Sequence, residues 1–276
     1  MRLVKIAPPG TFCHQEAIME MVKASKAKTF IELGCGDASL SSKLCAMGLS
    51  GIGVDMSADA IEIAGREMKN YIDAGKYKLV FGDALALKDL EPADLALSIM
   101  VMEHVEDDES FLKQMKSLVK AGGHLIVAVP GRRDCWSFED DTVGHYRRYD
   151  RSDMENILKK CGLNEVCTWS VGVPTVNLLW QLTNFMLKRN AHESGKINLS
   201  KEQQTASSGI REIPFKTVFP PLFKIILNRV SLSPLFFAQR FFYKSNLGLI
   251  IMSLAKKPAE KQSKQQVLVA VGKERS

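Results

Sequence analysis

The chain has 276 residues, of which 46% are hydrophobic and 25% are charged. This composition is typical of one large α/β domain or two small ones, and it excludes disorder as the main state. The six cysteines form no C-x-x-C pair, which disfavours a structural zinc site or a disulfide framework. The sequence has no recognisable signal peptide or membrane-spanning run. We therefore expect a cytoplasmic protein.

The formal net charge of +6 is unevenly distributed along the chain. Residues 1–170 carry −5, residues 171–258 carry +9 and residues 259–276 carry +2. The difference suggests two parts with different partners. A basic segment favours phosphate, anionic lipid or an acidic substrate, although solubility alone is an alternative explanation.

Apolar runs and helical patterns alternate through the first 160 residues. The predicted strands cover residues 27–33, 51–55, 77–81, 93–99 and 124–129. The predicted helices cover residues 39–47, 58–74, 108–120 and 152–160. Strands and helices at this spacing predict an α/β fold with a doubly wound, mostly parallel sheet.

The pattern changes after residue 171. We expect a helix over 174–189, a polar loop over 192–208 and a buried strand over 247–255. Seven of the thirteen phenylalanines fall within 214–244, where Pro220, Pro221 and Pro234 break the chain into short pieces. The expected organisation is an N-terminal helical segment, an α/β core, a helical cap, a final core strand and a disordered charged tail, which span residues 1–26, 27–170, 171–246, 247–258 and 259–276.

A glycine-rich turn follows the first predicted strand, in the sequence E-L-G-C-G-D-A at 32–38. Glycines allow close approach of the backbone to a ligand, and the helix that follows offers unpaired N–H groups. A dinucleotide fingerprint needs glycine at position 39, where this chain has Ser39. Glu32 would repel a pyrophosphate but would suit a cationic amino group. The alternative is an ordinary glycine turn.

Two further acids end the second and third predicted strands. Asp55 lies 21 positions after Gly34, where a carboxylate can accept both hydroxyls of a ribose. Asp83 and Ala84 follow the third strand, where a side-chain acceptor and a backbone N–H can read an adenine edge. Each acid alone is compatible with a solvated loop. Three acids at the ends of three successive strands instead predict one binding site.

These motifs, together with M-E-H-V-E-D-D at 102–108, resemble the class I S-adenosylmethionine-dependent methyltransferases over residues 25–170 and 247–255. The resemblance implies a Rossmann-like, seven-stranded sheet with a helical cap inserted before its last strand, and S-adenosylmethionine as cofactor. Glu32 and Gly34 would hold the amino-acid part of the cofactor, Asp55 its ribose, and Asp83 with Ala84 its adenine. The remaining expected cofactor contacts are Cys35, Gly36, Met56, Ser98 and Met100. Ala38 replaces a glycine that many members have, and we expect binding to survive this change.

The exit of the fourth predicted strand disfavours nucleic-acid substrates. Residues 98–102 lack the N/D-P-P-Y/F pattern of amino-methylating DNA enzymes, and Pro130 is followed by Gly131 and not by a cysteine nucleophile. His104 is either a wall of the methyl-transfer pocket or a packing histidine.

The segment 141–149 is the main candidate for contacts with the methyl acceptor. His145 could remove the acceptor proton, with Asp141 orienting its ring, and Tyr146 and then His104 are the next candidates for catalysis. Arg147 and Arg148 could clamp a carboxylate or phosphate, or could only form surface ion pairs. No metal site is predicted.

We therefore expect transfer of a methyl group to an oxygen or nitrogen of a small hydrophobic or acidic metabolite by in-line displacement. The Phe-rich cap either lines an acceptor pocket, lies on a membrane surface through 214–244, or completes the core. Alternative functions are a methyltransferase-like protein without turnover and a membrane-surface enzyme with a lipid or isoprenoid acceptor. An oxidoreductase is disfavoured by Ser39 and Glu32. The sequence does not specify an oligomeric state.

Overall fold

The computed structural model describes residues 4–5, 9–87, 89–178, 180, 218–219 and 228–259. Of the helix expected over 174–189, residues 175–178 and 180 are helical. The polar loop expected at 192–208, much of the Phe-rich segment and the charged tail beyond residue 259 lie outside the described residues. Within the described residues, none of the helices combines the length and apolar character needed to cross a bilayer.

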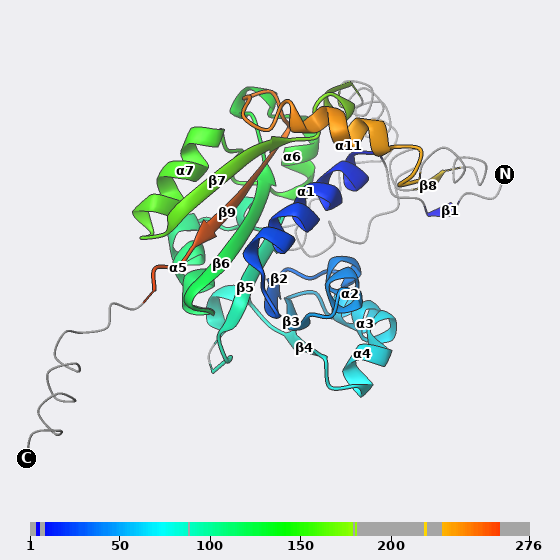
Figure 1. Ribbon diagram of the computed structural model, residues 1–276, viewed down its shortest axis with the longest axis vertical. Coiled ribbons are helices and arrows are strands. Elements are labelled where there is room, and N and C mark those ends of the chain that lie inside the picture. The colour runs from blue at the N-terminus through cyan, green and yellow to red at the C-terminus, as the bar shows by residue number, and fades with distance from the viewer. Residues whose placement is uncertain are drawn as a thin grey trace, which may run out of the picture.

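A seven-stranded sheet forms the centre of the molecule (Figure 1). Its spatial order is β4-β3-β2-β5-β6-β9-β7, and β9 is antiparallel to both of its neighbours while the strands from β4 to β6 are parallel. The strands are β2 (Thr29–Leu33), β3 (Ser50–Asp55), β4 (Tyr77–Phe81), β5 (Ala93–Ile99), β6 (Val119–Pro130), β7 (Asn164–Val171) and β9 (Ile250–Lys256). The expected fold class is confirmed. A separate two-stranded ribbon pairs β1 (Val4–Lys5) with β8 (Val218–Phe219).

Helices cover both faces of this sheet, as the apolar stripes of the sequence require. On one face pack α1 (Pro9–Ser25), α2 (Ser39–Ala46) and α3 (Ala58–Glu67), with Met21 and Leu44 fully buried among their side chains. On the other face pack α5 (Asp108–Ser117) and α7 (Arg151–Lys160), through Phe111 and Leu158. Each such side chain contributes about 1.5–3 kcal/mol through burial. The shorter helices are α4 (Lys69–Asp73), α6 (Phe138–Val143) and α11 (Ser233–Arg240).

Two helix predictions were too long. The helix expected over 58–74 is divided at Met68, which leaves helical geometry at ψ 3° and whose side chain is fully buried. The helix expected over 108–120 ends at Ser117, because Val119 already pairs with Ala93 as the first residue of β6. The Ala-Gly-Gly sequence at 121–123, which directly follows the expected helix, therefore lies inside a strand.

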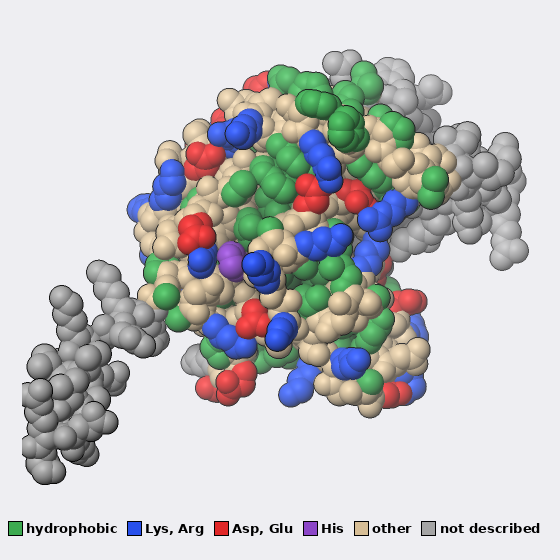
Figure 2. All heavy atoms as spheres, viewed as in Figure 1, with side chains coloured by type: hydrophobic (Ala, Val, Ile, Leu, Met, Phe, Trp, Pro, Cys, Tyr) green, Lys and Arg blue, Asp and Glu red, His purple; other side chains and the backbone are tan. Residues whose placement is uncertain are grey.

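The last core strand, expected at 247–255, is observed as β9, inserted between β6 and β7. Just before it, α11 lies against α1, where Gln239 donates to the Cys13 carbonyl at 3.0 Å and Arg240 pairs with Glu20. Hydrophobic side chains gather on the surface over α11 (Figure 2), where Phe237 and Phe241 are 61% and 74% exposed.

Candidate active site

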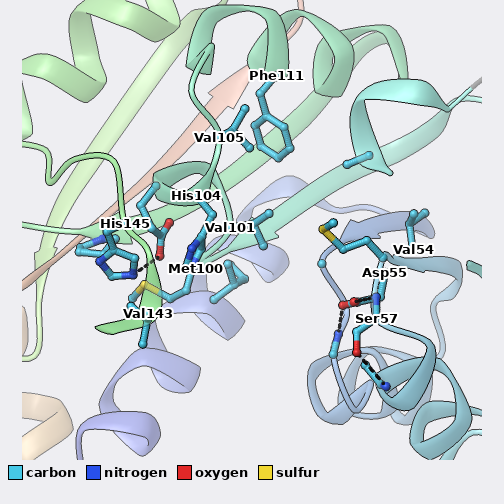
Figure 3. A pocket seen from close by; sticks show the side chains of 18 of the residues that line it. Val54, Asp55, Ser57, Met100, Val101, His104, Val105, Phe111, Val143 and His145 are labelled. Carbon is cyan, nitrogen blue, oxygen red and sulfur yellow. Dashed lines mark hydrogen bonds and ion pairs between the residues drawn. The ribbon is translucent and has the colours of Figure 1, made fainter. Parts of the chain in front are cut away.

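A cavity of about 610 Å³ opens at the carboxyl ends of the parallel strands (Figure 3). Its wall includes Gly34 after β2, Asp55 at the end of β3, Asp83 after β4 and Met100 after β5. Open α/β sheets bind ligands at this edge, where the loops of adjacent strands diverge. The cavity therefore brings together side chains that the sequence places far apart.

The glycine-rich turn forms the floor beside β2. Gly34 has φ +73°, and a Cβ atom at this position would lie 2.3 Å from Cγ2 of Val101. Only glycine satisfies both the left-handed backbone and this close approach. The backbone N–H of Gly36 donates to Oδ2 of Asp55 at 2.8 Å, so the turn is fixed to the end of the neighbouring strand.

Asp55 and Asp83 both face the cavity, as predicted, and both are held by backbone donors. Asp55 accepts a second hydrogen bond from the Ser57 N–H at 2.9 Å through Oδ1, as Figure 3 shows. Asp83 accepts from the Leu85 N–H at 2.9 Å. Each carboxylate oxygen retains a lone pair for a ligand, because an ionised carboxylate offers about four acceptor sites.

Three of the expected cofactor contacts lie behind this wall instead of on it. Glu32 is 3% exposed and accepts a hydrogen bond from Ser41 Oγ at 2.5 Å. Its burial raises its pKa to about 8. Cys35 and Ser98 are also buried, and none of the three lines the cavity. The cofactor contacts expected for these three residues stay predictions. Gly36, Met56, Ala84 and Met100 do line the cavity.

The opposite side of the cavity carries Glu103, His104 and His145. Glu103 and His104 belong to a short 3-10 turn after β5, Met102–His104, whereas His145 follows α6. The rings of His104 and His145 meet edge to face with centroids 4.7 Å apart. His145 Nε2 lies 3.9 Å from Oε1 of Glu103. In Figure 3 His104 and His145 lie across the cavity from Asp55.

Asp140, and not Asp141, orients His145. Oδ1 of Asp140 lies 2.7 Å from Nδ1 of His145, whereas Asp141 accepts from the indole N–H of Trp136 at the surface. The prediction for Asp141 was therefore wrong. Asp140 is the N3 residue of the capping box of α6, so its carboxylate points back toward Ser137 and into the fold.

The two arginines are already bound to acids of the chain. Arg148 donates through Nε to Asp140 at 2.8 Å and through Nη1 to the Gly131 carbonyl at 3.0 Å. Arg147 donates to Asp108 at 2.9 Å and to the Glu106 carbonyl. Arg148 lines the cavity but Arg147 and Tyr146 do not. These bonds support the alternative interpretation, in which both arginines serve ion pairs within the protein.

Burial changes the pKa values of ionisable groups on the side of the cavity that carries the histidines. It raises the pKa of Glu103 to about 8, a shift that its own backbone amide partly offsets. Burial, together with the neighbouring His145, lowers the pKa of His104 to about 4. Burial alone would raise the pKa of Asp140, but hydrogen bonds from His145 and Arg148 hold it well below its usual range.

Glu103, His104 and His145 also offer one ligand atom each within 4.8 Å of one another, so they could hold a metal ion. Sequence reasoning named both histidines but missed Glu103 and Asp140. Glu103 stands beside His104 in the motif at 102–108, and that adjacency was the available signal. The sequence indicates the role of Asp140 less clearly, because Asp141 lies next to it. Only the geometry of the helix decides which of the two carboxylates faces His145.

Comparison with known proteins identifies the family. Residues 13–168 match the family described as "Methyltransferase domain". A ubiquinone biosynthesis O-methyltransferase from Cupriavidus pinatubonensis is 30% identical over 105 residues, which is 38% of this chain and 42% of that protein. The matched region thus spans less than half the length of this relative.

Two solved structures share the fold. The [4+2]-cyclase SpnF has a TM-score of 0.56 at 12% identity, covering 89% of this chain and 82% of that one. Phosphoethanolamine N-methyltransferase 2 from Haemonchus contortus, in complex with S-adenosyl-L-methionine, has a TM-score of 0.56 at 14% identity, covering 88% and 52%. With the family match over more than half its length, the chain belongs to the methyltransferase domain family.

Proposed function

We propose that this protein is an S-adenosylmethionine-dependent methyltransferase that methylates a hydroxyl oxygen of a small acceptor. The observation that carries the proposal is that the two sides of the cavity bear different kinds of residues. One side has the glycine turn, Asp55 and Asp83 at three successive strand ends, and the other has Glu103 and two histidines. Such a division suits a cofactor and an acceptor that meet at Met100 and Val101 between them.

On the cofactor side, each wall residue suits one part of S-adenosylmethionine. The close backbone approach at Gly34 suits the methionine chain, and the two oxygens of Asp55 suit the ribose hydroxyls. Asp83 and Ala84 suit the adenine edge. Glu32 lies behind the wall, where the positive charge of the bound cofactor would favour the ionised form of its buried carboxyl group. In this proposal residues 27–170 and 247–258 form the core, and residues 171–246 form the cap.

On the acceptor side, an oxygen acceptor is supported by the name of the relative from Cupriavidus pinatubonensis. An acidic acceptor is disfavoured, because Arg147 and Arg148 are bound to Asp108 and Asp140. Apolar wall residues suit an acceptor with an apolar body: Val143, Val176, Leu249 and Ile250. In the reaction the O–CH3 bond forms as the S–CH3 bond breaks, sulfur keeps the electron pair, and the hydroxyl proton would pass to His145, which lines the same side of the cavity. The enzyme mainly aligns the two reactants.

We further propose that the surface around α11 contacts a membrane. Val230, Phe237 and Phe241 are 83%, 61% and 74% exposed around α11. Exposed apolar patches mark surfaces for partners or membranes. Co-sedimentation with vesicles of phosphatidylglycerol and phosphatidylcholine tests it. Replacing Phe237 and Phe241 by serine should release the protein from the vesicles, and unchanged sedimentation would refute the contact.

Two measurements test the main proposal. Calorimetry with S-adenosylhomocysteine should show one site per chain, and turnover to that product should appear with a panel of hydroxylated aromatic compounds. Binding without turnover across the panel would instead favour a cofactor-binding protein that does not transfer methyl groups. Failure to bind the product at all would refute the proposal.

A further inference from the structure

His14 brings an imidazole ring from α1 to the cavity. The residue lines the cavity, and its Nε2 atom is shielded from solvent without a hydrogen bond to any described residue. Burial lowers the pKa of His14 to about 4, so the ring is neutral at neutral pH. A buried polar atom without a partner is costly and uncommon in native proteins. Its position beside a cavity therefore suggests a ligand that supplies the partner.

Trp180 brings a second polar atom of this kind. It belongs to the helical residues 175–178 and 180 that follow β7, and it lines the same cavity. Its Nε1 atom is also shielded from solvent and makes no hydrogen bond within the described part of the chain. An indole N–H group is a donor only, so the ligand atom that pairs with it must be an acceptor.

Both residues come from elements at the end of the sheet that is far from the cofactor acids. The chain leaves β7 at Gly172, and β7 and β4 are the two edge strands of the sheet. His14 lies close to this exit, because a Cβ atom on Gly172 would lie 3.6 Å from its Nε2 atom. The helix α1 also contacts β6, the strand that precedes His145 in the chain. His14 and the start of the segment that carries Trp180 therefore belong to the acceptor side.

Gln239 of α11 holds α1 against the exit of β7. Its side chain is 1% exposed, donates to the Cys13 carbonyl at 3.0 Å and accepts from the Gly172 N–H at 3.3 Å. Cys13 directly precedes His14, so this one amide group fixes the backbone beside the imidazole. A polar group that is held in place before a ligand arrives loses less conformational freedom when the ligand binds.

We propose that His14 and Trp180 form a polar subsite for the methyl acceptor, which carries at least one uncharged oxygen besides the hydroxyl group that is methylated. The proposal rests on the proposed function, because it assigns this part of the cavity to the acceptor. The indole N–H requires an oxygen that accepts. A neutral imidazole can pair with a carbonyl, ether or hydroxyl oxygen, according to its tautomer.

The apolar surroundings make this subsite selective. Val176, one helical turn before Trp180, lines the cavity, as do Leu249 and Ile250. An acceptor without the additional oxygen would leave the polar atoms of His14 and Trp180 unpaired, and buried polar groups discriminate between ligands in this way. A neutral imidazole and an indole also offer no ion-pair partner to a charged group. The acceptor class is therefore a neutral molecule with an apolar body, a hydroxyl group and another uncharged oxygen.

Paired phenols test the subsite in the full chain saturated with S-adenosylhomocysteine. One member of each pair is a phenol with a para-hydroxyalkyl arm. The other member is the para-alkylphenol of equal length, in which a methyl group replaces the terminal hydroxyl. Arms of increasing length carry the terminal oxygen to successive positions in the cavity. Calorimetry gives the ratio of the two dissociation constants, and comparing this ratio between variants isolates the contribution of each side chain.

His14→Leu should lower the preference for the hydroxylated member about tenfold at the arm length that binds best, and Trp180→Phe should lower it about threefold. His14→Gln keeps a polar atom near the position of Nε2 and should retain most of the preference. His124→Leu is the matched control, because His124 does not line the cavity. The stability of ligand-free His14→Leu against urea should not fall, because the variant removes a buried polar atom that has no partner among the described residues.

A preference that His14→Leu and Trp180→Phe reduce, and that His14→Gln and the control retain, supports the subsite. An equal preference in the wild type and His14→Leu at every arm length overturns it, as does a wild type that shows no preference or binds none of the phenols. If His14→Leu fails to fold, Trp180→Phe, which keeps an aromatic ring, decides the matter. Calorimetry with S-adenosylhomocysteine alone reports the proposed function separately, since the product can bind whether or not the phenols do.

Discussion

The two sides of the cavity are built in different ways. On the cofactor side, each polar residue follows its own strand, and the bond that joins Gly36 to Asp55 spans 19 positions of sequence. On the acceptor side, the 3-10 turn after β5 meets a segment beyond β6, and Tyr149 bonds Asp108 across 41 positions. The cofactor side is therefore assembled from the ends of adjacent strands, whereas the acceptor side also needs the turn after β5 to meet the segment beyond β6.

The two sides also differ in the hydrogen bonds that their carboxylate groups accept from the protein. Backbone N–H groups hold Asp55 and Asp83 in place before any ligand arrives. The carboxyl oxygens of Glu103, by contrast, accept no hydrogen bond from another described residue. The acids of the cofactor side are thus preorganised by neighbouring backbone groups, while Glu103 is not. Single substitutions on each side can show whether the two sides act independently.

The largest expected effect is on the acceptor side. His145→Ala should lower methyl transfer about 10²–10³-fold, because a lost interaction of several kcal/mol with the reacting oxygen corresponds to that ratio. The affinity for S-adenosylhomocysteine should stay unchanged. Turnover assays and calorimetry on the same sample measure both. If both quantities fell together, the two sides would not be independent.

Asp55→Ala is the reciprocal change on the cofactor side. Loss of two hydrogen bonds to a charged group should cost about 2–3 kcal/mol, or about 30–150-fold in affinity for S-adenosylhomocysteine. Asp59→Ala, on the exposed first turn of α3, is the control. Unchanged affinity measured by calorimetry would remove Asp55 from the cofactor site.

Sequence reasoning succeeded where the signal is local and failed where it is not. The strand at 77–81 and the acids at 55 and 83 were placed correctly, because apolar runs and the acids that end them lie together in the sequence. The partner of His145 was missed by one residue, since Asp140 and Asp141 are equivalent in pattern. The geometry of α6 turns Asp140 inward and leaves Asp141 at the surface. The burial of Glu32 could not be read from its motif.

Gly34→Ala tests the close approach on which the cofactor side depends. Alanine at φ +73° is strained, and its Cβ would lie 2.3 Å from the Val101 side chain. We expect a loss of about 1–3 kcal/mol in the free energy of unfolding. Urea unfolding measures this loss of stability, and Gly36→Ala is the variant with which Gly34→Ala is compared. Gly36 shares the positive φ, but a Cβ added there would meet no atom within 4 Å, so this variant should lose less. Equal losses would show that strain alone, without the contact with Val101, explains the glycine.

The smallest expected effect concerns the pH dependence contributed by Glu32. Burial raises its pKa from 4.5 to about 8 in the folded protein. Below about pH 4.5 the carboxyl group is protonated in both states, so its contribution to stability is fully present. As the pH rises toward 8, only the unfolded chain releases this proton, and stability falls. Glu32→Gln cannot ionise and keeps an acceptor for Ser41, so its advantage over the wild type should grow between pH 5 and pH 8. The difference in the free energy of unfolding should grow by about 1 kcal/mol or more, since one pKa unit corresponds to about 1.4 kcal/mol.

Urea unfolding without ligand at the two pH values measures this difference, and Glu62→Gln, a change at an exposed residue, is the control. A constant difference between Glu32→Gln and the wild type would mean that Glu32 ionises alike in the folded and unfolded chains, so that burial does not raise its pKa.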